Sequence, residues 1–223
     1  MWLHNFIIHC GTVVIFITLA VSIYYYHREK PAYFRDIFIF ILLGILLSSN
    51  SILLREKWGF IRKAPYLIQE LLLLGQYILL VLFFLKILIN SSFIKKIKTI
   101  FIFSLLVNIL LWFLSFYKNI DIKPSSISTL FLLSYCAFYV RDIMTNKPTL
   151  ILVKSSSFWI VMGIFFYSCI SFPIVTMIKF IPRNSEYINL RSELFSVINM
   201  SLIILYSFII KGYLCLRHPL SSL

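Results

Sequence analysis

Acidic and amide side chains lie within a stretch of sequence that is otherwise apolar. Residues 65–89 read PYLIQELLLLGQYILLVLFFLKILI, with Gln69 and Glu70 near the start and Gln76 further along. The stretch is long enough to cross a bilayer, since about 20 apolar residues suffice. A charge in lipid is costly, so such side chains usually face a bundle interior or a water-filled cavity. These residues could bind a ligand, carry an ion or a proton, or join helices through hydrogen bonds.

Polar residues also occur in other apolar segments, at a comparable depth. His9 lies near the start of the first segment and Glu193 near the start of the last, while Asn50 lies near the end of a segment that runs the other way. Asn199 belongs to the helical stripe that carries Glu193, because residues three, four and seven apart share a face. We therefore expect one polar pocket in the outer leaflet, with these candidate ligand-binding residues: Glu70, His9, Gln69, Gln76, Glu193, Asn50 and Asn199.

The Glu70 carboxyl could be stabilised inside an apolar segment in several ways. His9 could pair with it, Arg191 could reach it from the rim, or the carboxyl could be neutral, because desolvation disfavours the charged form. Structural hydrogen bonding is the simpler interpretation for the Ser and Asn residues and for His9. For Glu70 and Glu193 a ligand, ion or proton role and a structural role stand side by side.

The motifs of several enzyme and cofactor classes are missing. His9 is the one histidine well inside an apolar segment, and neither an HExxH nor a GxSxG pattern occurs. The four cysteines show no CxxC spacing. Lys211 lies at the end of the last segment, which argues against a retinal-type lysine. We therefore predict no catalytic residue, no metal site and no cofactor.

Composition and hydropathy predict the fold class. Hydrophobic residues make up 61% of the 223 and charged residues 13%, against about 25% charged in soluble domains. We predict an all-α polytopic membrane protein, a seven-transmembrane-helix bundle forming one domain over residues 1–223. The first segment lacks the basic residues that open a signal peptide, so we expect it to be retained. The expected spans are 5–26, 36–54, 65–89, 97–117, 126–141, 157–179 and 188–211.

The net charge of +13 does not indicate nucleic-acid binding. The basic residues are spread over every connection between the segments, so no compact basic domain could follow a phosphate backbone. They are better explained as flanks of membrane helices that contact the lipid bilayer and its anionic headgroups. A slight excess of Lys and Arg on one side places the N-terminus outside and the C-terminus inside.

Two regions of the chain resemble a known group of proteins. One is YLIQELLLLGQYILL with its early Glu70, and the other is LFLLSYCAFYVRDIM followed by SSFWIVMGIFFYSCISF, in which Phe158 and Trp159 open a span. Together they resemble a group of small uncharacterised bacterial seven-helix membrane proteins, often associated with sensor histidine kinases. The resemblance implies signalling and a bacterial inner membrane, and it supplies no catalytic residue.

We therefore expect a sensory or signalling module, such as a receptor. A small molecule or lipid would bind the polar pocket, and a signalling protein would dock on cytoplasmic loops that include Lys95, Lys96, Lys98 and Arg141. The alternatives are a proton- or cation-coupled transporter or transporter subunit, an intramembrane enzyme that modifies lipids, and a structural subunit of a membrane complex. A channel is disfavoured, because the inner halves of the segments are almost wholly apolar.

Overall fold

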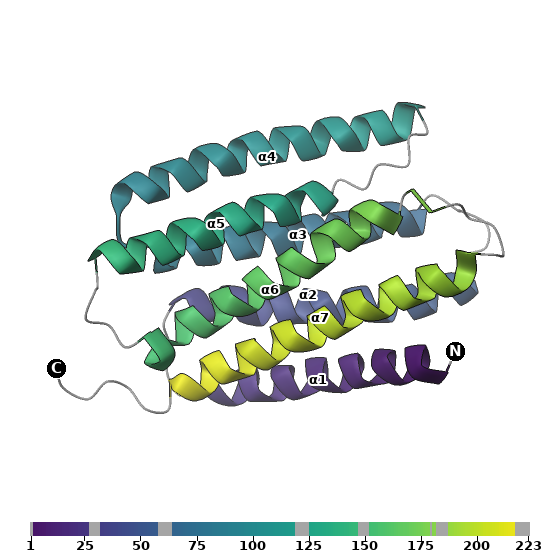
Figure 1. Cartoon of the computed structure of the whole chain (residues 1–223), viewed down its shortest axis with the longest axis horizontal. Coiled ribbons are helices and arrows are strands. Elements are labelled where there is room, and N and C mark those ends of the chain that lie inside the picture. The colour runs from purple at the N-terminus through teal and green to yellow at the C-terminus, as the bar shows by residue number, and fades with distance from the viewer. Residues whose placement is uncertain are drawn as a thin grey trace.

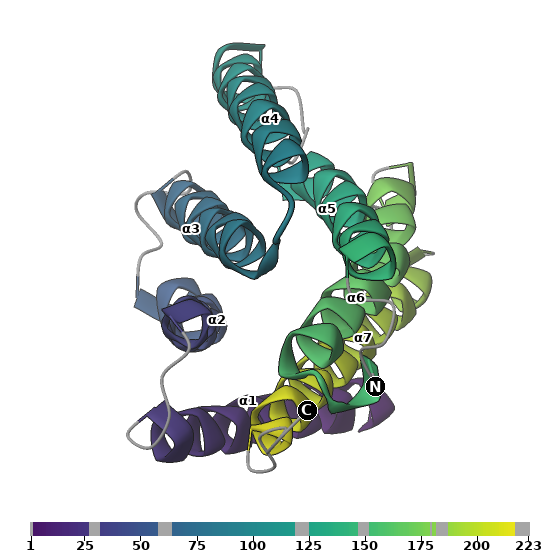
Figure 2. The ribbon, with the colours of Figure 1, turned by 90° about the vertical axis from the view of Figure 1, so that its left-hand side faces the viewer.

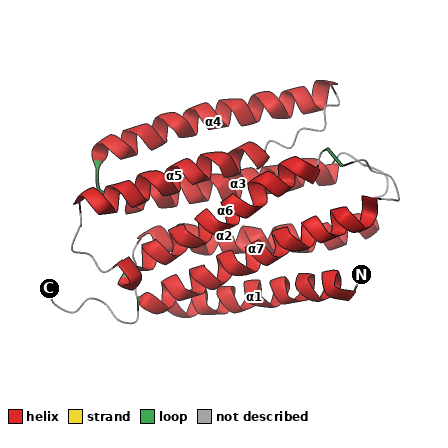
Figure 3. Ribbon diagram, viewed as in Figure 1, coloured by secondary structure: helices red, strands yellow, loops and turns green. Residues whose placement is uncertain are grey.

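Every long element of the described chain is a helix. The computed structural model describes residues 2–26, 32–57, 64–118, 125–146, 152–178, 180–181 and 187–216. Within these ranges there are seven α-helices and one short 3-10 helix, shown in red in Figure 3, which confirms the all-α prediction. The elements are α1 (Trp2–Tyr26), α2 (Ala32–Lys57), α3 (Ala64–Ile87), α4 (Ser91–Lys118), α5 (Ser125–Asn146), η1 (Leu152–Lys154), α6 (Ser156–Ile178) and α7 (Ile188–Cys215).

Several helices have the length and composition of membrane spans. Among the described residues, four helical stretches are long and apolar enough to cross a bilayer, in α3, α5, α6 and α7, and α1 holds a shorter apolar stretch, His9–Tyr25. In lipid a helix satisfies its own backbone hydrogen bonds, which explains why apolar sequence takes this form here. Even Pro173 is accommodated inside α6. The chain is therefore a helical membrane protein.

The helices run up and down and leave the chain ends far apart. In Figure 1 the N-terminus and the C-terminus lie at opposite ends of the bundle, and α1, α3, α5 and α7 point the same way. Viewed from the C-terminal end in Figure 2, six helices follow one another around a ring in the order α1, α2, α3, α5, α6 and α7, with α7 packed on α1. The remaining helix, α4, lies outside this ring against α5 and α3.

The core of the bundle is aromatic and aliphatic. Phe83 and Phe84 of α3, Tyr135 of α5 and Ile209 of α7 are almost completely buried. The closest helix pair, α6 and α7, approaches across Gly163, because a Cβ there would lie 2.8 Å from the Cβ of Phe208. Small residues of this kind let helices in lipid pack at short range. Large apolar side chains also remain exposed along the outer faces, as expected for a surface in contact with acyl chains.

Two ends of the bundle must be distinguished for the argument below. We call the end where α1, α3, α5 and α7 finish and α2, α4 and α6 begin the basic end, which is on the left in Figure 1. Helices at this end extend beyond the predicted apolar segments. For example, α4 begins at Ser91 rather than 97 and thus includes Lys95 and Lys96. A helix can continue through such residues because lysine is a good helix former whose ammonium reaches the headgroup region.

Candidate functional site

Glu70 is the most deeply buried of the predicted ligand-binding residues whose side chains are described. It lies in the second turn of α3 with 8% of its surface exposed. Its neighbour Gln69 is exposed. The sequence therefore indicated correctly that a carboxyl group lies inside the protein, at the end of the bundle opposite the basic end.

Gln76 lies further along α3 and joins three helices. Its Nε2 donates a hydrogen bond to the carbonyl oxygen of Phe40 in α2, at 3.3 Å. The same nitrogen would lie 3.3 Å from a Cβ added at Gly44, and the Tyr206 hydroxyl of α7 would contact that Cβ as well. Gly44 is thus the point where α7 and α3 reach α2. Sequence analysis missed Gly44 and Tyr206, since neither belongs to a polar stripe.

The other predicted residues are more dispersed. His9 on α1 and Glu193 on α7 are exposed, and Asn199 is half-buried. Neither His9 nor Glu193 is buried together with Glu70 in the described chain. Asn50 falls within α2, but its side chain lies outside the described residues. A ligand-binding role for these residues stays a prediction.

A second polar group joins α3, α4 and α5 inside the bundle. The hydroxyl of Tyr77 lies 2.5 Å from Ser104 Oγ and 2.9 Å from the hydroxyl of Tyr135. Asn108 Nδ2 donates to the Ser104 carbonyl oxygen at 2.7 Å, and its Oδ1 accepts a hydrogen bond from Ser128 at 3.1 Å. All five residues are buried. Ser104 and Asn108 lie four residues apart and thus form one stripe on α4, which faces inward.

The directions of these hydrogen bonds follow from donor counting. Ser104 Oγ donates to the carbonyl oxygen of Phe101 at 2.8 Å, so its single proton is used. Ser104 must then accept from Tyr77, and Tyr77 must accept from Tyr135. The chain of donors therefore runs from α5 through α3 into the backbone of α4. Each donor has an acceptor, which is what helix-packing hydrogen bonds in a membrane require.

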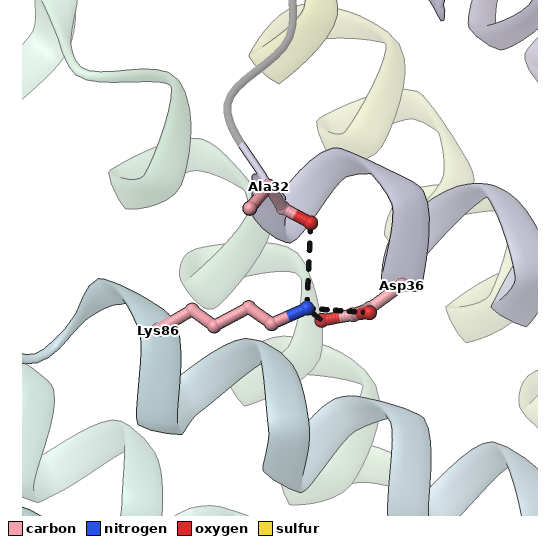
Figure 4. A network of polar contacts seen from close by, with 3 residues as sticks. All are labelled: Ala32, Asp36 and Lys86. Atoms are coloured by element: carbon pink, nitrogen blue, oxygen red, sulfur yellow. Dashed lines mark hydrogen bonds and ion pairs between the residues drawn. The ribbon is translucent and has the colours of Figure 1, made fainter.

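An ion pair joins α2 and α3 at the basic end. Lys86 Nζ lies 2.8 Å from Asp36 Oδ1 and 2.6 Å from Oδ2, and it also donates to the carbonyl oxygen of Ala32 at 3.4 Å (Figure 4). The Asp36 side chain is 4% exposed and the Lys86 side chain 31%. The sequence carried a signal for this pair, because an acid near the start of one helix and a lysine in the last turn of the next lie at the same end of two antiparallel helices.

A second carboxylate at the basic end accepts hydrogen bonds from backbone groups. Asp142 of α5 accepts hydrogen bonds from the backbone N–H of Ile89 at 2.8 Å and of Asn90 at 3.3 Å. Asn146 Nδ2 adds a third bond at 2.6 Å. With 1% of its surface exposed, Asp142 anchors the α3–α4 connection to α5 and offers no charge to the surface.

The cations at the basic end, unlike the two carboxylates, are mostly exposed. Within the described residues the one ion pair is Asp36–Lys86, and the remaining Lys and Arg of this end are exposed. Two aromatic rings support some of them: Lys96 and Arg141 each lie 5.7 Å from the centre of the Phe93 ring, and Lys211 lies 5.8 Å from that of Trp159. These exposed cations are Arg35, Lys95, Lys96, Lys98, Arg141, Lys154 and Lys211.

The described residues contain no group of three or more His, Cys, Asp or Glu that could hold a metal ion. Buried polar groups of the described chain bond partly within their own helix and partly between helices, and seven exposed cations of the described residues lie at the basic end. The arrangement can thus bind anionic partners at the basic end, and it offers Glu70 as a buried carboxyl near the other end.

Comparison with known proteins gives no relative from which a function could be transferred. No family model, no curated protein and no solved structure matches the chain. The resemblance to bacterial seven-helix proteins associated with sensor kinases therefore stays a prediction, and the functional argument depends on the geometry of this chain.

Proposed function

We propose that this protein is a signalling module of the membrane, which senses a small molecule or lipid near Glu70 and acts through a separate protein bound at its basic end. The observation that carries the proposal is the charge arrangement at that end. Both described acids there are buried and occupied, Asp36 by Lys86 and Asp142 by backbone N–H groups, while seven cations stay exposed. Among the described residues of this end, an acidic partner would meet exposed positive charge and no exposed carboxylate.

The centre of the partner site is assigned to the start of α6 and the end of α7. Val153 is 59% exposed, and the Trp159 indole donates a hydrogen bond to its carbonyl oxygen at 2.7 Å. Lys211 lies over the Trp159 ring, and Lys154 is exposed beside Val153. A rigidly held tryptophan among cations and exposed apolar surface has the composition of protein interfaces, where aromatic residues contribute strongly.

The proposed transmission uses the contact between α2 and α3. Glu70 and Lys86 lie on the same helix, about 24 Å apart along its axis at 1.5 Å per residue. Between them Gln76 bonds to α2, and at the basic end Lys86 bonds to α2 again. A ligand that displaces α3 at Glu70 would move both contacts, because a helix shifts as a unit and interfaces of this kind switch between discrete packings. By the positive-inside rule the basic end faces the cytoplasm.

The test is affinity purification from native membranes, with mass spectrometry of the bound proteins. We expect one stoichiometric protein with an acidic surface. The variant Lys154→Gln/Lys211→Gln should lose most of it, whereas Arg191→Gln, at the opposite end, should retain it. If the partner is absent, or equally abundant with all three proteins, the proposal is refuted.

The sensing part of the proposal has its own measurement. A small molecule or lipid that co-purifies with the wild-type protein should be depleted by Glu70→Gln and retained by Gln69→Glu. The latter adds a carboxylate at the exposed neighbouring position and serves as the control. Retention of the compound by Glu70→Gln would remove Glu70 from the binding site and leave it a structural residue.

A further inference from the structure

The exposed face of α4 changes from basic to apolar along its length. Lys95 and Lys98 lie on its first two turns, and Ile102, Leu106 and Ile109 follow at intervals of three and four residues on the same face. All of these side chains are exposed, the apolar ones by 58–61%. One uninterrupted surface therefore begins with cations and continues as hydrocarbon.

This surface belongs to the outermost helix. Its opposite side holds the buried Ser104 and Asn108 that attach α4 to α3 and α5. The outer side is thus the part of α4 that faces away from the ring in Figure 2. The apolar part from 102 to 109 rises about 10 Å, which fits within one leaflet of a hydrocarbon core about 30 Å thick.

Two cations from different helices lie beside the basic end of this surface, since Lys96 is about 100° around α4 from Lys95. Lys96 of α4 and Arg141 of α5 flank the same Phe93 ring at 5.7 Å each, so their charges are separated by no more than twice that distance. Phe93 is 7% exposed and packs against Phe138, with ring centres 5.8 Å apart, which fixes the ring. The nearby Asp142 carboxylate accepts its hydrogen bonds from Ile89, Asn90 and Asn146 and not from these two cations.

We infer that this corner of the basic end is a binding site for an anionic phospholipid. Lys96 and Arg141 hold the phosphate, Lys95 and Lys98 add positive charge, and the acyl chains lie along Ile102, Leu106 and Ile109. Two cations that share one ring can bind a common anion, and an oxygen-rich phosphate accepts hydrogen bonds from both ammonium and guanidinium groups. The continuous apolar face below favours a lipid over a soluble anion. This site uses the four exposed cations of α4 and α5, whereas the partner site is centred on Trp159, Lys154 and Lys211.

The test uses the full-length protein in detergent, stripped of lipid and then titrated with phosphatidylglycerol or phosphatidylcholine of the same acyl chains. Native mass spectrometry counts the bound lipids. The wild-type protein should bind phosphatidylglycerol preferentially. Lys96→Gln/Arg141→Gln should weaken that binding about 30-fold, since each basic side chain near an anionic surface contributes about fivefold. The matched control, Lys154→Gln/Lys211→Gln, removes the same charge and should bind like the wild type.

Several results would overturn the inference. Equal binding of the two lipids by the wild-type protein would remove the anionic preference, and an equal loss in both double variants would reduce it to net charge. A Lys96→Gln/Arg141→Gln protein that keeps its phosphatidylglycerol but loses a co-purified protein would make the corner a protein interface. A second measurement does not depend on these variants: a photoactivatable acyl chain on phosphatidylglycerol should label the α4 face at 102–109, and labelling spread evenly over all helices would contradict the site.

Discussion

The Asp36–Lys86 pair gives the most quantitative prediction, because its two partners differ in burial. The Asp36 side chain is 4% exposed and that of Lys86 31%. Replacing Lys86 by methionine leaves a buried carboxylate without its cation, a change that costs about 3 kcal/mol of unfolding free energy. Replacing Asp36 by asparagine should cost less, about 1 kcal/mol, because the freed lysine can extend to water and headgroups while the amide still accepts a hydrogen bond.

The two changes together should restore most of the stability. In Asp36→Asn/Lys86→Met no buried charge remains, so the loss should be about 1 kcal/mol and the coupling between the sites about 3 kcal/mol. The assay is reversible unfolding in mixed micelles as the fraction of denaturing detergent rises, with Lys95→Met as the control. Lys95 is exposed, and its loss should stay within about 0.5 kcal/mol. Equal costs for the single variants, or simple addition in the double variant, would refute this reasoning.

Two further predictions concern the packing of the helices. Gly163→Ala should lower the unfolding free energy by about 1–3 kcal/mol, since its methyl group would meet Phe208 and the backbone oxygen of Leu205 at 3.2 Å. The methyl group of Gly11→Ala would lie at an ordinary van der Waals distance, 3.9 Å, from its nearest neighbour, so this variant should be neutral or slightly stabilising. Similar losses in both variants, in the same micelle assay, would contradict the close contact of α6 and α7. Asn108→Leu removes one hydrogen bond within α4 and one between α4 and α5, and it should cost about 1–3 kcal/mol of unfolding free energy. The α3–α4 connection should also be cleaved faster by proteases. Unchanged proteolysis would show that the attachment of α4 does not depend on this residue.

The sequence was sufficient for the fold class because hydropathy acts on whole segments. Long apolar stretches must become helices in lipid, and charged residues must interrupt or flank them. The depth argument was also correct for Glu70, whose burial follows from its position inside an apolar segment. The stripe of Ser104 and Asn108 pointed inward as expected, since a lipid-facing amide would be costly.

The directions of other side chains could not be derived in this way. His9 and Glu193 lie close enough to helix starts that their exposure costs little, because headgroups and water can reach them. The contact of Gly44 with Tyr206 and Gln76 depends on which helices are neighbours around the ring. That order is determined by tertiary packing and not by the periodicity of any single segment.

Sequence analysis predicted cations at the basic end, but it did not predict that Asp36 and Asp142 are buried there. A count of Lys and Arg on each side gave only a slight bias. The structure adds that the two described acids of this end, Asp36 and Asp142, are buried and hydrogen-bonded, so neither carboxylate is exposed beside the cations. Such a difference depends on hydrogen bonds between residues about fifty positions apart, which no local pattern encodes.

The central claim is that a separate protein binds the basic end, and site-specific photo-cross-linking in intact cells tests it most directly. One variant would carry a photoreactive residue at Val153, which is 59% exposed at the basic end. A second variant would carry it at Leu190, which is 44% exposed at the opposite end. The account predicts one discrete cross-linked protein from position 153 and none from position 190. A protein captured from position 190 alone, or no adduct from position 153, would contradict it.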